Sequence, residues 1–139
     1  MVLIINAKNQ ILGRMCSDIS HKLLTGTEKI IVVNCRSTVI SGREKNILSR
    51  FDQRTERKGK GNPTKNAKYP KYPDKIVKFA VRGMLPRNAR GTSALRRLKA
   101  YIDVPEEYAK DLAKENSVPK ISFITLEQVS NHFGIYFKK

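Results

Sequence analysis

The stretch LIINAKNQILGRMCSDISHKLLTGTEKIIVVN, residues 3–34, decides the fold class of this protein. Its two ends, residues 3–6 and 29–34, are short and apolar, which predicts two buried strands. The segment between them repeats apolar residues at the spacing of one helix face, at Leu12, Met15, Cys16, Ile19 and Leu23. Gly26 suits the end of that helix. A strand, an amphipathic helix and a strand predict a βαβ unit, and therefore an α/β fold around a parallel sheet.

Further helices are expected beyond this unit. Residues 43–57 consist of helix formers with a narrow apolar face, and residues 74–85 repeat the helical pattern. Asp74 is placed to cap the second of these helices, and Pro86 is placed to end it. Its core-facing side is expected to consist of Ile76, Phe79, Ala80, Gly83 and Met84.

The last third of the chain predicts two more helices. Thr92 or Ser93 is placed to cap the first of them, with an inward side made of Leu95, Leu98 and Ile102. A strand-like segment, ISFIT, then leads into a second helix. Thr125 and Gln128 form a capping-box pattern at its start, and Gly134 suits its end.

The charge of the chain is large and unevenly distributed. The 139 residues, a length that predicts one domain over 1–139, carry 28 Lys and Arg against 12 Asp and Glu, a formal net charge of +16. Residues 50–100 contain sixteen basic side chains and only three acidic ones, whereas residues 101–139 are close to neutral. This excess predicts a polyanionic partner, either nucleic acid or an anionic membrane. The basic residues lie in Gly- and Pro-containing loops rather than on a long amphipathic helix, which favours nucleic acid.

Residues 58–73, KGKGNPTKNAKYPKYP, predict a long basic loop extension because they lack a periodic apolar face. We expect this loop to order on RNA. Tyr69 and Tyr72 leave two interpretations open, since they can stack on bases or pack the loop onto the domain. The candidate RNA-binding residues of the loop are Lys58, Lys60, Lys65, Lys68 and Lys71.

Residues 80–97, AVRGMLPRNARGTSALRR, combine five arginines with two glycines and a proline. Gly83, Pro86 and Gly91 are expected to shape a rigid corner from which the arginines project, and the planar guanidinium suits phosphate contacts. Replacing such projecting arginines is expected to weaken RNA binding and to leave thermal stability nearly unchanged. The candidate RNA-binding cations here and on the preceding helix are Lys75, Lys78, Arg82, Arg87, Arg90, Arg96 and Arg97.

The segment SGRE, residues 41–44, places a glycine turn at a helix start. Such a turn can hold a phosphate beside Arg43, or it can simply cap the helix. The chain has no helix-turn-helix, zinc-finger or RNP signature, which favours structured RNA over DNA.

No catalytic centre, metal site or cofactor is predicted. His21 and His132 are expected to be surface or packing residues, and the glycine fingerprints GxGxxG and GxxxxGK[ST] are absent. Cys16 and Cys35 lack CxxC spacing, which indicates reduced thiols rather than a disulfide or a metal pair. The N-terminus does not have the pattern of a secretory signal, and no apolar run approaches the roughly 20 residues of a membrane span.

The segments VRGMLPRN and RGTSALRRLKAY resemble the signature of the universal large-subunit ribosomal protein thirteen family. NAKNQILGRMCSDISHKLLTG and IIVVNCRSTVISG agree in order, and the ending FITLEQVSNHFGIYFKK resembles the archaeal and eukaryotic branch. The resemblance covers nearly the whole chain. It implies a three-layer α/β/α fold around a mostly parallel four-stranded sheet. It also implies a non-enzymatic, cytoplasmic protein of the large ribosomal subunit that binds rRNA, contacts neighbouring ribosomal proteins, supports early assembly and is monomeric within the ribosome.

The resemblance also carries site residues over to this chain. The family signature falls on Arg82, Gly83, Met84, Leu85 and Pro86, and continues to Gly91 and the arginines around it. The LGR of the first helix falls on Gly13 and Arg14, and Arg14 is a further candidate RNA contact. Two alternatives remain at this point, which are an RNA-binding translational regulator acting off the ribosome and a small nucleotide-binding enzyme.

Overall fold

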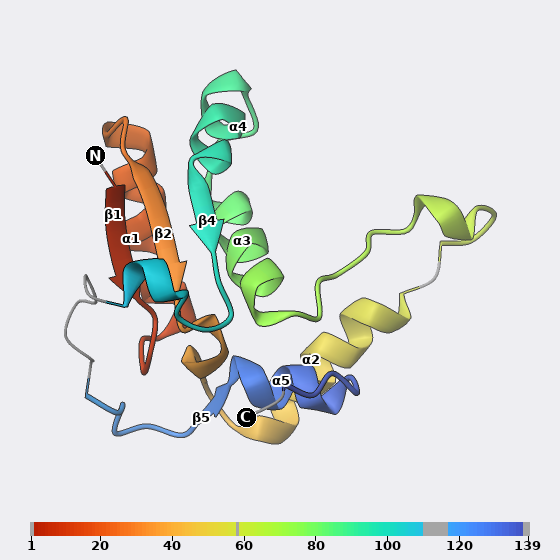
Figure 1. Ribbon diagram of the computed structural model, residues 1–139. Coiled ribbons are helices and arrows are strands. Elements are labelled where there is room, and N and C mark those ends of the chain that lie inside the picture. Colours follow the sequence, from red (N-terminus) through yellow and green to blue (C-terminus); the bar gives the residue numbers. More distant parts are fainter. Residues whose placement is uncertain (1, 58, 110–116, 138–139) are drawn as a thin grey trace.

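The predicted strand–helix–strand unit is present in the computed structural model, which describes residues 2–57, 59–109 and 117–137 (Figure 1). It consists of β1 (Val2–Asn6), α1 (Leu12–Thr25) and β2 (Lys29–Val33). β1 and β2 run parallel, and β4 (Leu98–Ala100) continues the parallel sheet on the other side of β2. The sheet order is β1-β2-β4, which confirms the predicted α/β fold with a parallel sheet.

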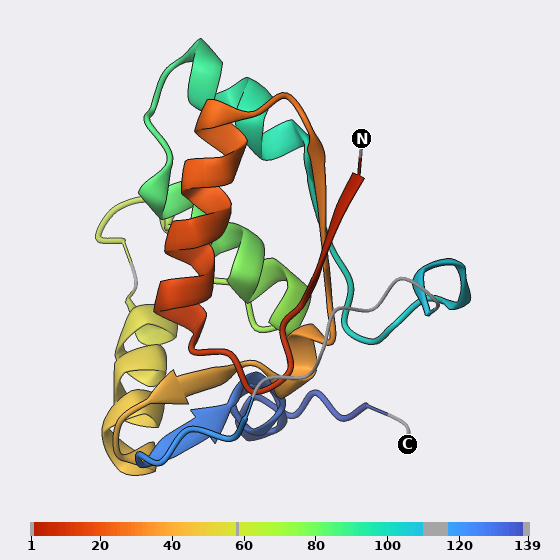
Figure 2. The ribbon, with the colours of Figure 1, turned by 90° about the vertical axis from the view of Figure 1, so that its left-hand side faces the viewer.

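Three helices cover one face of this sheet: α1, α3 (Pro73–Met84) and α4 (Ala89–Arg96) (Figure 2). Ile30 and Val32 of β2 belong to the buried cluster that these helices share. Ile31 and Val33 alternate with them and are buried as well. The short 3-10 turn η3 (Glu106–Tyr108) lies beyond the opposite face (Figures 1 and 2). In the described residues the parallel sheet thus has three strands and one helical layer, and does not complete the expected four strands and three layers.

A second group of elements lies at the end of the sheet. β3 (Val39–Ser41) and β5 (Phe123–Thr125) form an antiparallel ladder, with α2 (Glu44–Glu56) and α5 (Leu126–His132) beside it. This group contributes to the same buried cluster as α1 and α3, through Ile47, Ile124, Leu126 and Val129. One hydrophobic core therefore links both groups of elements.

Several predicted helix ends are confirmed by their hydrogen bonds. The capping box of α5 is complete, since the Thr125 side chain accepts from the Gln128 N–H and the Gln128 side chain accepts from the Thr125 N–H. Gly134 follows this helix with φ +77°. Its N–H and that of Ile135 return to carbonyls of the last turn, which is the hydrogen-bond pattern of a Schellman end. Gly26 likewise follows the end of α1.

The prediction for the helix after Pro86 is wrong at both ends. α4 begins at Ala89 because the Asn88 side chain, rather than Thr92 or Ser93, caps it and accepts from the Gly91 N–H at 3.0 Å. It ends at Arg96, and the chain then enters β4 instead of continuing as a helix toward Ile102. Backbone hydrogen bonds to β2 hold this strand. Leu98 is buried as predicted, but it is a strand residue.

The prediction for α3 is wrong about its cap and about part of its buried face. The helix begins at Pro73, whose ring suits the first helical position, and Asp74 lies in the first turn without capping it. Val77 and Val81 fill the buried side of the helix, together with Pro73 and Ile76. Phe79 and Met84, predicted to be core residues, are 42% and 45% exposed. The helix is therefore rotated about its axis relative to the prediction.

The predicted basic loop leaves the body of the molecule after α2 and returns at α3 (Figure 1). Between α2 and α3, the one regular element of the described residues is the 3-10 turn η2 (Pro63–Lys65), at which the Asn62 side chain accepts from the Thr64 N–H. We call residues 59–72 the arm. Lys58 lies outside the described residues. Among the helices of the described ranges, none is both long enough and apolar enough to cross a membrane.

Candidate nucleic-acid interface

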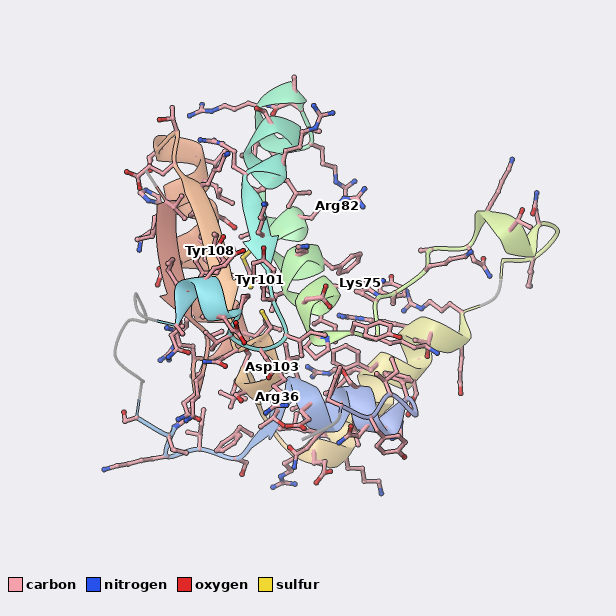
Figure 3. The ribbon with its side chains drawn as sticks, viewed as in Figure 1. Arg36, Lys75, Arg82, Tyr101, Asp103 and Tyr108 are labelled. Carbon is pink, nitrogen blue, oxygen red and sulfur yellow. The ribbon has the colours of Figure 1, made fainter. Side chains whose placement is uncertain are left out.

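One side of α3 combines three cations with an aromatic ring. Lys75, Lys78, Phe79 and Arg82 follow each other at helical spacing, opposite the buried side of Val77 and Val81. The two labelled cations, Lys75 and Arg82, lie on the side of α3 that faces away from the sheet (Figure 3). Sequence reasoning assigned Phe79 to the core and thus missed it here. Its position three residues before Arg82 and four after Lys75 is the signal that places it among the cations.

The arm and α4 turn this helix face into an open hollow of about 400 Å³. Its lining residues are Lys68, Tyr69, Pro70, Lys75, Lys78, Phe79, Arg82 and Leu95. Four of these side chains are cationic, two are aromatic, and no carboxylate is among them. We call this feature the α3 hollow. Its composition matches the basic and aromatic surface that proteins use for single-stranded RNA.

The base of the arm is fastened to the body of the molecule. Tyr69 packs edge-to-face on Phe79 with 5.6 Å between ring centroids, and the Arg54 guanidinium lies 5.9 Å from the centre of the Tyr69 ring. The Ser130 hydroxyl of α5 donates to the Lys71 carbonyl at 2.8 Å. Of the two interpretations of Tyr69, the packing of the loop onto the domain is therefore observed.

Tyr72 differs from Tyr69. It is 42% exposed, and the Lys75 Nζ lies 5.0 Å from its ring centre, so one face of a tyrosine and a cation are presented together beside the α3 hollow. Lys60 and Lys65 are exposed farther along the arm.

The five arginines of residues 80–97 divide into two groups. Arg97 donates from Nη1 to the Gly26 carbonyl and from Nη2 to the Leu23 carbonyl, both at 2.6 Å. Arg90 donates from Nη2 to the Leu24 carbonyl at 2.9 Å. These carbonyls lie at the C-terminal end of α1, where helices leave acceptors without partners and where the helix dipole favours positive charge. The expectation that all five arginines project from the corner is therefore wrong for Arg90 and Arg97, which are bonded to α1. Arg97 is half-buried, whereas Arg90 is exposed, as are Arg82, Arg87 and Arg96.

The family-signature residues also divide into two groups. At Gly91, a Cβ atom would lie 1.9 Å from the Pro86 carbonyl oxygen, so that the close approach between α4 and the preceding turn requires glycine. Leu85 is buried under this corner, whereas Met84 is exposed. A Cβ at Gly83 would meet no atom within 4 Å. Leu85, Pro86 and Gly91 thus shape the corner, and Gly83 and Met84 lie on its solvent side.

Three remaining candidates lie outside the α3 hollow. Gly13 and Arg14 are exposed in the first turn of α1. Arg43 is exposed at the N-cap of α2, next to Gly42 with φ +132°, and no side chain caps this helix. The structure does not bring these residues into the hollow.

Comparison with known proteins identifies the family of this chain. The profile of the family described as "Ribosomal protein L13" matches residues 1–107. A protein of Methanococcus maripaludis named "Large ribosomal subunit protein uL13" is 33% identical, and the alignment covers 98% of this chain and all of the relative. Proteins of the same name from Archaeoglobus fulgidus and Saccharolobus solfataricus are each 36% identical, over 94% and 96% of this chain and 86% and 93% of their own lengths.

The chain belongs to the ribosomal protein L13 family. This confirms the resemblance seen in the sequence. The archaeal relatives extend the similarity past residue 107, the end of the profile match, into the part of the chain that contains β5 and α5. The L13 family is structural and not enzymatic.

The two cysteines of this L13-family chain are buried, and two ion pairs join its elements. Burial raises the pKa of the Cys16 and Cys35 thiols from 9.0 to about 12, and both are free thiols. His132 joins α5 to α2 through its Nε2, which lies 2.9 Å from Asp52 Oδ1. Arg36 pairs with Asp103 at 2.9 Å (Figure 3). Within the described ranges, no cluster of three or more His, Cys, Asp or Glu side chains is arranged to hold a metal ion.

Proposed function

We propose that this chain is a structural constituent of the large ribosomal subunit and binds ribosomal RNA through the α3 hollow and the arm. The observation that carries the RNA contact is the composition of the hollow, where Lys68, Lys75, Lys78 and Arg82 surround two aromatic rings without a carboxylate. Membership of the L13 family supplies the ribosomal assignment.

The binding mechanism follows from polyelectrolyte physics. Each RNA phosphate that a lysine or arginine neutralises releases condensed counterions, and adds about 0.7–0.9 to the magnitude of the slope of log affinity against log salt concentration. The exposed cations of the α3 hollow, the arm and the α3–α4 corner supply these contacts. Arg90 and Arg97 contribute to the same surface indirectly, because their bonds to α1 hold α4 beside the hollow. Arg14, Arg43 and Lys58 are additional proposed contacts.

The wider role is that of a cytoplasmic ribosomal protein without DNA or membrane partners. It supports early subunit assembly, touches neighbouring large-subunit proteins, and is present as a monomer within the particle. The continuous core supports a single domain over residues 1–139. The buried side chains of Ile31 and Val33 support a third layer over the second face of the sheet, because apolar strand residues there need cover. A four-stranded sheet belongs to the same proposal.

Sedimentation of the tagged protein in cell lysate tests this function. We expect the protein to migrate with the large subunit at low salt and to remain there after a high-salt wash, because many simultaneous phosphate contacts hold it. Release by the wash into small RNA-containing complexes would favour the alternative, an RNA-binding translational regulator acting off the ribosome. Protein that stays at the top of the gradient in both conditions would contradict RNA binding itself.

A further inference from the structure

The ring of Phe79 packs on Tyr69 at the base of the arm, but this contact covers it only in part. It is 42% exposed on a helix whose opposite side already contains Val77 and Val81. Phe79 makes an edge-to-face contact with Tyr69, and its ring also forms part of the wall of the α3 hollow. Exposed apolar surface that is rimmed by polar residues is typical of ligand-binding grooves, and here Phe79, Pro70 and Leu95 supply such a surface together.

The surroundings of this ring indicate the chemistry of its ligand. Pro70 and Leu95 supply further apolar wall, while Lys75, Lys78 and Arg82 surround it with positive charge. A flat apolar group attached to negative charge fits this combination, and a nucleobase with its phosphates has both properties. The volume of about 400 Å³ lies in the range of pockets that bind small ligands.

The position of the ring selects unpaired over paired RNA. In an A-form helix the bases are stacked on each other, and the surface offers phosphates and 2′-hydroxyl groups rather than base faces. The stacked bases of such a duplex cannot reach an aromatic ring in a hollow, whereas a base that leaves the stack can lie against the ring. The surrounding cations span Lys75 to Arg82, two helical turns or about 10 Å along the axis. They can therefore meet the phosphates on both sides of one nucleotide.

We propose that the α3 hollow binds a single unpaired nucleotide of the RNA, with its base against Phe79 and its flanking phosphates at Lys75, Lys78 and Arg82. This inference rests on the proposed function, because it assumes that the chain binds RNA. It goes further in naming the state of the nucleotide that the hollow recognises.

A tryptophan at position 79 gives a direct readout, because the chain has no tryptophan of its own. The full-length Phe79→Trp variant is titrated with two RNA hairpins of equal length, one fully paired and one with a single unpaired adenosine in its stem. Stacking of a base on the indole quenches its fluorescence, so we expect quenching by the bulged hairpin and little change with the paired one. Equal quenching by both hairpins, or by neither, overturns the inference.

Affinity measurements on full-length Phe79→Ala give a second, independent readout. Loss of one base–aromatic stack is expected to weaken binding of the bulged hairpin about tenfold and to leave binding of the paired hairpin unchanged. Met84→Ala is the matched control, because Met84 lies on the same helix with a similar exposure and outside the lining of the hollow. Its affinity for both hairpins should equal that of the parent protein.

The outcomes separate this inference from the proposed function. If Phe79→Ala binds both hairpins as the parent does, the hollow does not recognise an unpaired base, although RNA binding stands. If the parent protein binds neither hairpin and also fails to sediment with the large subunit, the proposed function fails, and the inference with it. The melting temperature of each variant shows that it is folded.

Discussion

On α3, the cations Lys75, Lys78 and Arg82 surround the exposed ring of Phe79, whereas the arginines Arg90 and Arg97 point back to the carbonyl end of α1. The two groups lie within 25 residues of sequence and are chemically similar. Their surroundings differ, since the first group lines an open hollow and the second donates hydrogen bonds to backbone carbonyls at the end of α1. Local positive charge in the sequence therefore does not reveal whether a basic side chain serves binding or stability.

Substitutions can perturb the α3 cations and the arginines bonded to α1 separately. Substitutions at the contact between α1 and α4 should lower the free energy of unfolding, and substitutions in the α3 hollow should lower the affinity for RNA.

The largest effect is expected on the thiols buried beneath the helices. Because the pKa of Cys16 and Cys35 is about 12 rather than 9.0, the reactive thiolate fraction at about pH 8 falls about 1000-fold. Reaction with a colorimetric thiol reagent should therefore be slow in buffer and fast in denaturant. The pKa of each thiol is higher in the folded than in the unfolded protein. Burial of the neutral thiols therefore favours the folded state fully below about pH 9, and this contribution to the free energy of unfolding is lost as the pH rises toward about 12. Rapid reaction of either thiol without denaturant would mean that the helical layer opens readily.

Gly91→Ala tests the corner that carries α4. The added Cβ would lie 1.9 Å from the Pro86 carbonyl oxygen, a backbone atom that cannot move away alone. We expect a loss of about 3 kcal/mol in the free energy of unfolding, as for other overpacked sites, measured by urea denaturation. Gly83→Ala is the control, and should stabilise the protein by up to about 1 kcal/mol because its Cβ meets open space on a helix. Equal stability of the two variants would refute the packing at the corner.

Arg97→Ala tests the bonds to α1 directly. It removes two charge-assisted hydrogen bonds of 2.6 Å from a half-buried guanidinium, so the free energy of unfolding should fall by about 2 kcal/mol. The adjacent Arg96→Ala is matched in charge and sequence but exposed, and should change stability by less than about 0.5 kcal/mol. Urea denaturation of both proteins compares them. A small effect of Arg97→Ala would place this arginine with the binding cations instead.

Simultaneous replacement of Lys75, Lys78 and Arg82 by alanine tests the proposed RNA contact of the α3 hollow. The slope of log RNA affinity against log salt concentration should fall in magnitude by about 2, because up to three phosphate contacts are lost. The melting temperature should change little. A control variant with alanine at Lys29, Lys99 and Lys120 removes the same charge from exposed positions away from the hollow. If both variants lower the slope equally, the RNA contact is diffuse rather than localised.

The smallest effect is expected from Arg90→Ala. Its single bond to the Leu24 carbonyl lies at the surface, so the free energy of unfolding should fall by about 0.5–1 kcal/mol. Arg87→Ala, an exposed neighbour in the same corner, should leave stability unchanged within error. Thermal denaturation of each variant, at matched salt, distinguishes them. Identical melting temperatures would restore the expectation that both arginines simply project into solvent.

Much of the fold was predictable because its signals are local. The apolar spacing of α1, the β-branched runs of β1 and β2, and the capping box of α5 each depend on residues a few positions apart. The basic composition of the arm and the cations of α3 were equally visible in the sequence. β4 was missed because its three residues form a strand through pairing with β2, and nothing in their own pattern distinguishes them from a helix end.

The α/β class, the parallel βαβ unit, the resemblance to the L13 family and the location of positive charge all follow from the sequence alone. The tertiary structure alone decided which face of α3 is buried, and with it the exposure of Phe79. That choice depends on α1, whose Cys16 lies against the backbone of Val77, 61 residues away. It also decided the role of Arg97, whose carbonyl partners lie 71 and 74 residues away. Helical periodicity and capping act over a few residues, whereas these contacts exist only after distant segments have packed together.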